Sequence, residues 1–196
     1  MSTVIVPRWE WRTFAGRFDA DVDLRFDALP AERMDESDET YLVSPHSDAS
    51  VKVRAGLVDI KAVVEVSDDG LQRWKPLLKA PYPLSAEAVV VLARALGVTV
   101  PPLQRDEYKR EQLVDELIRP HPELLPVRVH KHRAHYTLAG CMAERSEVRC
   151  EQGEQRTIAV ESEDGDLVRA TVRGLGFDVR ANVSLPRELK VLAGIA

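Results

Sequence analysis

The sequence predicts an α+β fold with roughly seven or eight strands, mostly antiparallel, and two or three helices. The first observation is the segment Ser50–Lys61, which alternates apolar and charged residues on both sides of Gly56, a pattern typical of a β-hairpin. The second is that this alternation recurs along the chain, each time with long charged side chains on one parity. Because residues two apart share a face of a strand, one sheet face is expected to be charged and the other apolar.

The N-terminal part is expected to be largely extended. Thr3–Phe14 is the first strand, because its charged residues and its tryptophans fall on opposite parities. Phe18–Thr40 contains Pro30 and an acidic run, so we expect a loop and a short helix there. Thr40–Val43 is a second short strand, and the central hairpin continues to about Val66.

The middle of the chain contains the clearest helix, Ser85–Leu96. Ser85 is a suitable N-cap, and Gly97 follows the last helical residue. Val98–Leu103 is interrupted by two prolines and is expected to be a strand or an extended segment. The apolar residues of Arg105–Ile118 follow neither the helical period nor the strand period cleanly, so this segment is expected to be either a second helix or a strand.

The C-terminal part returns to strands before it ends in helical segments. Val127–Thr137 alternates and predicts a strand, and Cys141–Cys150 with Arg156–Glu163 predicts a further hairpin. Asp166–Leu175 is expected to be a short helix. Asn182–Leu192 is expected to be irregular, or a short helix after its proline.

Composition limits the classes of protein to consider. The 196 residues suit a single domain over 1–196, and 44% are hydrophobic, which is ordinary for a folded protein. The net charge of −5 argues against a nucleic-acid-binding protein, and no apolar run reaches membrane-spanning length. Two cysteines do not suggest a disulfide scaffold, and the N-terminus lacks a signal-peptide core. We therefore expect a cytoplasmic protein with no membrane partner.

The charged face of the predicted strands has two interpretations. If it faces outward, the sheet belongs to a half-solvated sandwich; if it faces inward, the sheet closes into a barrel with a polar lumen. The alternation of apolar and charged residues is the same in a sandwich and in a barrel, so it does not distinguish them. The positive and negative residues cluster separately, however, which suggests a functional site. The carboxylates cluster at Glu161 and Glu163. The cations cluster at Lys52, Arg54, Lys61, Lys131 and Arg133.

Phosphoryl transfer is the chemistry that such a site would suit. Several converging Arg and Lys donors can position a polyanionic phosphate and stabilise its charge. Two carboxylates spaced two apart on a strand can hold a hard cation such as Mg²⁺ or Mn²⁺. Glu161 and Glu163 have this spacing, and Glu10 is a candidate third ligand.

In their order, these motifs resemble the triphosphate tunnel metalloenzymes, or CYTH superfamily. The family pattern is an E-x-E-x-K strand, an R-x-R strand, a following Lys, a K-x-R strand and a late E-x-E strand. The resemblance runs from about Arg8 to Glu163, and each motif alone is weak. The matching segments are Glu10-Trp11-Arg12, Asp38-Glu39-Thr40-Tyr41, Lys52-Val53-Arg54, Lys61, Arg73-Trp74, Lys131-His132-Arg133 and Glu161-Ser162-Glu163.

The resemblance implies an eight-stranded antiparallel barrel whose charged lumen binds a triphosphate and a divalent metal. Glu10, Glu161 and Glu163 would hold Mg²⁺ or Mn²⁺. The cations expected to bind substrate phosphate are Arg12, Lys52, Arg54, Lys61, Lys131 and Arg133. Arg8 departs from the family, because it stands where the first Glu belongs and so removes one expected metal ligand. Glu147 shares a parity with Arg145 and Arg149, and could stand where the family often has an Asp.

Two functional classes remain open from sequence. The first is a divalent-metal-dependent enzyme that hydrolyses inorganic tripolyphosphate or an organic triphosphate, with metal-activated water as the nucleophile. The second is a catalytically degenerate module that binds polyphosphate or a phosphorylated ligand, which the substitution at Arg8 favours. An adenylyl cyclase would need an adenine-recognition feature that is not visible. A homodimer is also compatible with the apolar strand parity.

The simplest alternative for each motif is structural. The cations could lie on a solvated strand face, and Glu161 and Glu163 could pair with neighbouring arginines. His130, His132 and His135 alternate with cations and lack a suitable partner, which disfavours a zinc site. The three tryptophans are expected in the core or in packing on the barrel exterior. Neither cysteine has a recognisable base partner, so a thiol nucleophile is not expected.

Overall fold

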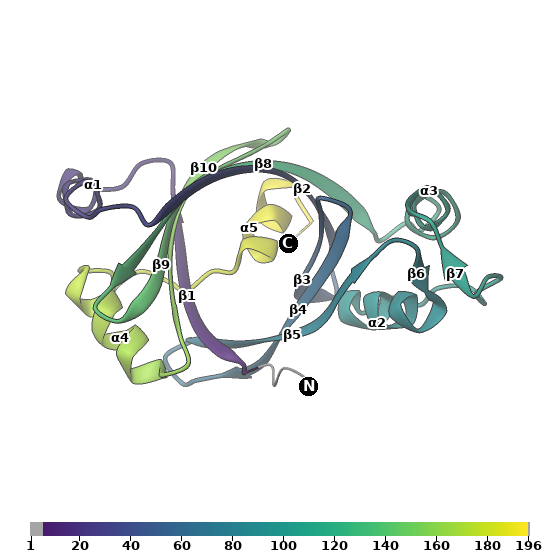
Figure 1. Ribbon diagram of the computed structural model, residues 1–196, viewed down its shortest axis with the longest axis horizontal. Helices are drawn as coiled ribbons and strands as arrows, with labels where there is room; N and C mark the ends of the chain where they lie inside the picture. The colour runs from purple at the N-terminus through teal and green to yellow at the C-terminus, as the bar shows by residue number, and fades with distance from the viewer. Residues whose placement is uncertain (1–5, 196) are drawn as a thin grey trace.

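Residues 6–195 are described in a computed structural model, and eight of their strands form a closed antiparallel barrel in the order β1-β10-β9-β8-β2-β3-β4-β5 (Figure 1). The predicted fold class is therefore confirmed, and the barrel is the correct alternative for the charged parity. The barrel strands are β1 (Arg8–Ala15), β2 (Arg33–Ser44), β3 (Ser47–Arg54), β4 (Leu57–Val66), β5 (Gln72–Pro81), β8 (Leu125–Leu138), β9 (Cys141–Cys150) and β10 (Gly153–Ser162).

Helices cover two sides of the barrel, and a two-stranded sheet of β6 (Leu84–Ser85) and β7 (Glu107–Tyr108) accompanies them (Figure 1). Helix α2 (Ala86–Leu96) is capped by Gly97, whose backbone is in the left-handed region (φ 67°) and where a Cβ would meet His46 at 3.0 Å. Within residues 6–195, no helix is long and apolar enough to cross a membrane. The helices are α1 (Ala20–Asp27), α2 (Ala86–Leu96), α3 (Arg110–Leu113) continued by a π-helical turn (Val114–Ile118), α4 (Gly165–Gly174) and α5 (Leu185–Leu192).

Strand alternation separates a packed exterior from a charged lumen. On β1, Trp11 is buried against the outer layer, where it stacks on Phe177 with ring centroids 5.4 Å apart. Helices α1 and α4 contribute Phe26 and Val168 to the same apolar cluster. Burial of these outer apolar faces stabilises the barrel and leaves the opposite parity for polar side chains.

Several sequence predictions of local structure are corrected. Strand β2 already begins at Arg33, within the segment expected to be loop and helix. Residues 98–103, expected to be a strand or an extended segment, contain no strand. Residues 105–118 are mainly helical, after the short strand β7. Helix α5 begins at Leu185, before Pro186 and not after it, because proline is tolerated in a first helical turn. The expected residues 3–5 of the first strand lie outside the described part.

The barrel closes at a short seam between β1 and β5. These strands share only the register pairs Arg8–Trp74, Trp9–Arg73 and Glu10–Gln72. Beyond the seam, Asn182 accepts a hydrogen bond from the Arg12 amide (2.8 Å) and donates to the carbonyls of Glu10 (3.2 Å) and Gly70 (3.0 Å). The Val183 amide also donates to the Arg12 carbonyl at 2.8 Å. The segment before α5 thus satisfies the β1 edge that β5 leaves unpaired.

Helix α5 packs into one end of the barrel (Figure 1). Leu185 and Leu189 are buried against inward-facing apolar residues of β2, β8 and β9. Lys190 anchors the helix, because its Nζ donates to the Ser47 carbonyl at 3.2 Å and pairs with Asp48. The helix therefore covers one end of the lumen and limits the depth of the cavity beyond it.

Candidate functional site

A cavity of about 200 Å³ lies inside the barrel. Strand residues of both charges line it, and Ser184, Leu185 and Pro186 of the C-terminal segment form part of its wall. The titratable lining residues are Glu10, Arg12, Tyr41, Lys52, Lys61, Lys131, Arg133, His135, Glu144 and Glu161. Charged side chains from β1, β3, β4, β8, β9 and β10 therefore converge on one cavity.

Most of the site residues expected from sequence meet at this cavity. The lining includes five of the expected phosphate-binding cations and two of the expected metal ligands. Arg54 does not line the cavity; its Nη1 lies 3.4 Å from Glu39 Oε1, and its side chain is 41% exposed. Glu163 follows the last residue of β10 and is exposed, so the structure separates it from Glu161.

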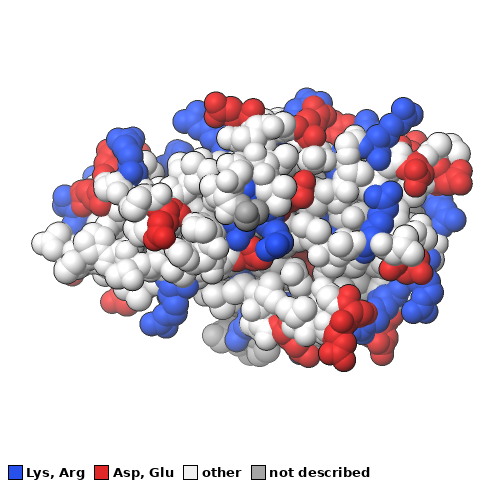
Figure 2. Space-filling model, turned by 180° about the vertical axis from the view of Figure 1, so that it is seen from behind, with Lys and Arg blue, Asp and Glu red and all other residues white. Residues whose placement is uncertain are grey.

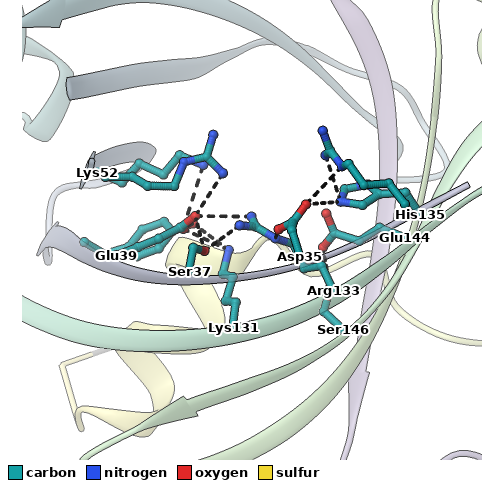
Figure 3. Close-up of polar contacts among 12 residues, drawn as sticks. Asp35, Ser37, Glu39, Lys52, Lys131, Arg133, His135, Glu144 and Ser146 are labelled. Atoms are coloured by element: carbon teal, nitrogen blue, oxygen red, sulfur yellow. Dashed lines mark hydrogen bonds and ion pairs between the residues drawn. The ribbon is translucent and has the colours of Figure 1, made fainter. Parts of the chain in front are cut away.

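Glu39 is the carboxylate around which the cations gather (Figure 3). Its side chain is fully buried, and it accepts hydrogen bonds from the hydroxyls of Ser37 (3.2 Å) and Tyr41 (2.9 Å). Burial would raise the pKa of Glu39, but nearby cations lower it to about 2. Its ion-pair distances are 3.2 Å to Arg133, 3.3 Å to Lys131, 3.4 Å to Arg54 and 3.8 Å to Lys52.

Glu144 has the same role for Arg12. Arg12 Nη1 lies 3.2 Å from Glu144 Oε1, and Arg12 Nε lies 3.0 Å from Glu10 Oε1. Burial would lower the pKa of Arg12, but the two carboxylates outweigh it and raise the value. The pKa of Glu144 is lowered in turn, because Arg12 and Lys131 outweigh the effect of burial. Arg12 is thereby held as a fixed cation in the lumen.

Lys131 has the most unusual ionisation of the group. Its Nζ donates to the Tyr41 hydroxyl at 2.8 Å and lies 5.0 Å from the centre of that ring. Burial lowers the pKa of Lys131 to about 7, although Glu39 opposes the shift. A lysine with this pKa exchanges its proton near neutral pH, and a bound anion would favour the charged form.

Glu10 and Glu161 form a carboxylate pair across the β1–β10 ladder. They are direct register partners, and both line the cavity. Burial raises the pKa of Glu161, and Glu10 adds to this effect, whereas Lys61 and Arg8 oppose it. Arg8 Nη1 lies 3.3 Å from Glu161 Oε1. Arg8 thus partly neutralises the pair.

These two carboxylates fit a hard divalent cation in their chemistry. Mg²⁺ is usually held by one or two carboxylates together with substrate phosphates and water. The pKa of Glu161 is raised mainly by burial and further by Glu10, and Lys61 and Arg8 do not fully offset these two effects. No group of three or more His, Cys, Asp or Glu side chains within residues 6–195 is arranged to hold a metal. The pair would therefore need oxygen ligands from a bound substrate.

Sequence reasoning missed several lumen residues. Glu39 and Glu144 were not selected, although each shares the parity of a lumen residue two positions away, Tyr41 and Met142. Glu147 was considered instead, but it pairs with Arg149 and Arg156 on the opposite parity. Trp74 also differs from expectation, because it lines the cavity, whereas Trp9 packs outside under Arg73. Whether Glu144 or Glu147 faces the lumen depends on how β9 pairs with its neighbouring strands. Alternation along one strand does not determine that pairing.

Comparison with known proteins identifies the fold. No protein-family model matches the sequence, and no curated protein matches it. The structure is similar to HpAC1 from Hippeastrum, described as a candidate adenylyl cyclase with a dominant triphosphatase activity. The identity is 14% and the TM-score 0.54, over 95% of this chain and 96% of that one. At this identity the similarity concerns the fold, which is the tunnel fold that the family resemblance predicted.

Two further structures align less closely. One is a candidate adenylate cyclase from Bacillus halodurans, with 10% identity and a TM-score of 0.48 over 92% of this chain and 95% of that chain. The other is the PH1819 protein of Pyrococcus horikoshii OT3, with 13% identity and a TM-score of 0.40 over 96% and 90%.

Proposed function

We propose that this protein is a divalent-metal-dependent triphosphatase that hydrolyses inorganic tripolyphosphate in its barrel lumen. The observation that carries the proposal is the convergence of Arg12, Lys52, Lys61, Lys131 and Arg133 on one cavity with the Glu10–Glu161 pair. Phosphoryl transfer is accelerated mainly by positioning and by charge stabilisation, and these side chains supply both.

The cations would bind the phosphate oxygens. Arg12 and Arg133 are oriented by carboxylates, so their planar donors are already positioned. Lys52 and Lys61 contribute point charges from β3 and β4. Glu10 and Glu161 would hold Mg²⁺ or Mn²⁺, which would polarise the phosphoryl group and lower the cost of activating water.

Cavity size supports an inorganic substrate. Pockets that enclose drug-sized ligands have volumes of roughly 300–1,000 Å³. The lumen cavity has about 200 Å³, and its lining includes five cations and three carboxylates. A nucleotide base or a thiamine ring would therefore have to remain outside it, and tripolyphosphate is the better fit. The triphosphatase activity named for the Hippeastrum protein is compatible with this proposal.

A phosphate-release assay tests the proposal. Tripolyphosphate, ATP and thiamine triphosphate are each supplied with Mg²⁺, with Mn²⁺ or with EDTA. We expect metal-dependent release from tripolyphosphate that exceeds release from the organic substrates. Glu161→Gln should abolish it, whereas Glu163→Gln, which changes an exposed carboxylate two residues away, should retain it. Equal activity in both variants would contradict the assignment of Glu161.

The second candidate is a polyphosphate-binding module without turnover. Two observations favour it: Arg8 lies 3.3 Å from Glu161, and four cations already pair with Glu39. Isothermal titration with tripolyphosphate separates the two candidates when it is combined with the release assay. Micromolar binding with no phosphate release in either metal would support the binding module and contradict the enzyme.

A further inference from the structure

His135 is an imidazole in the lumen for which phosphate binding and metal binding provide no role. It lies on β8, two residues beyond Arg133, and it lines the cavity with its side chain 24% exposed. Its Nε2 lies 3.0 Å from Asp35 Oδ2 on β2, the strand paired with β8 (Figure 3). A carboxylate at this distance orients an imidazole and stabilises its protonated form.

His135 Nε2 has a second neighbour, Arg33, toward which it would have to accept a hydrogen bond and not donate one. Arg33 Nη2 lies 3.0 Å from His135 Nε2, and a guanidinium can only donate. Asp35 requires a proton on Nε2, whereas Arg33 requires a lone pair there. In the tautomer that donates to Asp35, Nδ1 carries the lone pair. Nδ1 has no hydrogen-bond partner within residues 6–195, so it is available to a ligand or to water.

We infer that His135 is the proton acceptor of the reaction, oriented by Asp35. The inference rests on the proposed function. Water attacks the terminal phosphorus, a P–O bond forms, and the bond to the bridging oxygen breaks with its electron pair on the diphosphate. The proton of the attacking water passes to Nδ1 of His135 and then returns to solvent. The products are orthophosphate and diphosphate, and no other reactant is needed.

Among the charged groups around His135, Asp35 favours this role and Arg33 opposes it. Arg33 and Asp35 face it from β2, and Glu144 is its register partner on β9. Arg133 lies on its own strand and donates from Nε to Asp35 Oδ1 at 2.9 Å. Burial would raise the pKa of Asp35, but Arg133 and His135 outweigh it and lower the value. Asp35 is therefore ionised at neutral pH and can stabilise an imidazolium.

The experiment compares His135→Gln with His132→Gln. His132 lies on the same strand but lines an exterior pocket, so it is the matched control. With tripolyphosphate and Mg²⁺, His135→Gln should lower kcat about 100-fold, with KM changed less than about threefold. The acid limb of its pH–rate profile should disappear. His132→Gln should retain both the rate and the limb. Titration with metal-free tripolyphosphate checks that each variant is folded and binds.

Asp35→Asn is the second variant, because Asp35 is assigned as a positioning residue. Its kcat should fall about tenfold with little change in KM, since the imidazole loses the carboxylate that orients it. If wild-type protein hydrolyses tripolyphosphate and His135→Gln keeps its kcat and its acid limb, the inference is overturned while the proposed function stands. If wild-type protein releases no phosphate, both are overturned.

Discussion

At the scale of single residues, substitution of Glu39 tests how much the buried carboxylate among the lumen cations contributes to the stability of the fold. Glu39→Gln leaves four cations around a neutral amide, and removal of one partner from a buried ion pair is strongly destabilising. We expect the free energy of unfolding to fall by about 3 kcal/mol in urea at pH 7. Tripolyphosphate should restore part of this loss, because its oxygens can replace the carboxylate.

The matched control for Glu39→Gln is Glu36→Gln. Glu36 lies on the same strand with the opposite parity and is exposed. Its replacement should change the free energy of unfolding by less than about 0.5 kcal/mol. Equal losses in the two variants would show that the buried carboxylate has no special role among the cations.

Lys131 predicts a specific pH dependence of stability. Its pKa is lowered from 10.5 to about 7 in the folded protein, so the unfolded state binds more protons between these values. Stability contributed by this group is therefore lowest below pH 7 and increases as the pH rises toward 10.5, with a maximum slope of about 1.4 kcal/mol per pH unit.

Urea unfolding of wild-type protein and Lys131→Met between pH 6.5 and 9.5 measures this effect. The difference in unfolding free energy, wild type minus variant, should rise with pH across the range. Parallel pH profiles would contradict a lowered pKa of Lys131. Tyr41 remains protonated in this range, because burial and Glu39 raise its pKa well above 10.0.

The residues of the site were only partly predictable from sequence, for a physical reason. Alternation placed Lys131 and Arg133 on one face, and the motif order indicated that this face was the lumen. Alternation could not show that Glu39 would receive cations from β3 and β8 together, because that depends on pairing between distant strands. Glu163 illustrates the opposite case, since its spacing fits a metal pair but the strand ends one residue earlier.

At the scale of elements, Asn182 is predicted to control closure of the barrel. Asn182→Ala removes three hydrogen bonds that join β1 and the β4–β5 turn to the segment before α5. We expect a loss of about 2 kcal/mol in unfolding free energy. Because Glu10 and Arg12 belong to the same stretch of β1, binding of tripolyphosphate should also weaken, as measured by titration.

Asn182→Asp is the informative comparison for closure. It keeps an acceptor for the Arg12 amide but loses the donor to the carbonyls of Glu10 and Gly70. Its stability should lie between those of wild type and Asn182→Ala. Hydrogen exchange of the Arg12 amide should be faster in Asn182→Ala than in Asn182→Asp; the reverse order would contradict the assigned contacts.

Local sequence signals explain why some elements were predicted and others were not. Helix α2 combines an N-cap serine with a C-terminal glycine, so its bounds were predictable. Strand β2 begins with R-M-D-E-S-D, an unfavourable strand sequence, and is stabilised by non-local partners such as the Asp35–Arg133 pair. Pro76 lies inside β5 opposite Lys61, where the register shifts, which is a position where a sheet tolerates proline.

At the scale of the whole molecule, the important feature of the charge is where it lies: cations gather inside the barrel although the net charge of the protein is negative. The chain has a formal charge of −5, and the face shown in Figure 2 carries Lys, Arg, Asp and Glu side by side. The lumen instead brings cations from several strands into one cavity, with Glu39 and Glu144 holding them in place. Composition could not reveal this arrangement, because it depends on closure of the sheet.

A crystal structure with tripolyphosphate and Mn²⁺, recorded with anomalous diffraction, tests the central claim most directly. The account predicts an anomalous peak between Glu10 and Glu161 and phosphate density within hydrogen-bond distance of Lys52, Lys61 and Arg133. Phosphate density confined to the exterior of the barrel, with no manganese at Glu161, would contradict it.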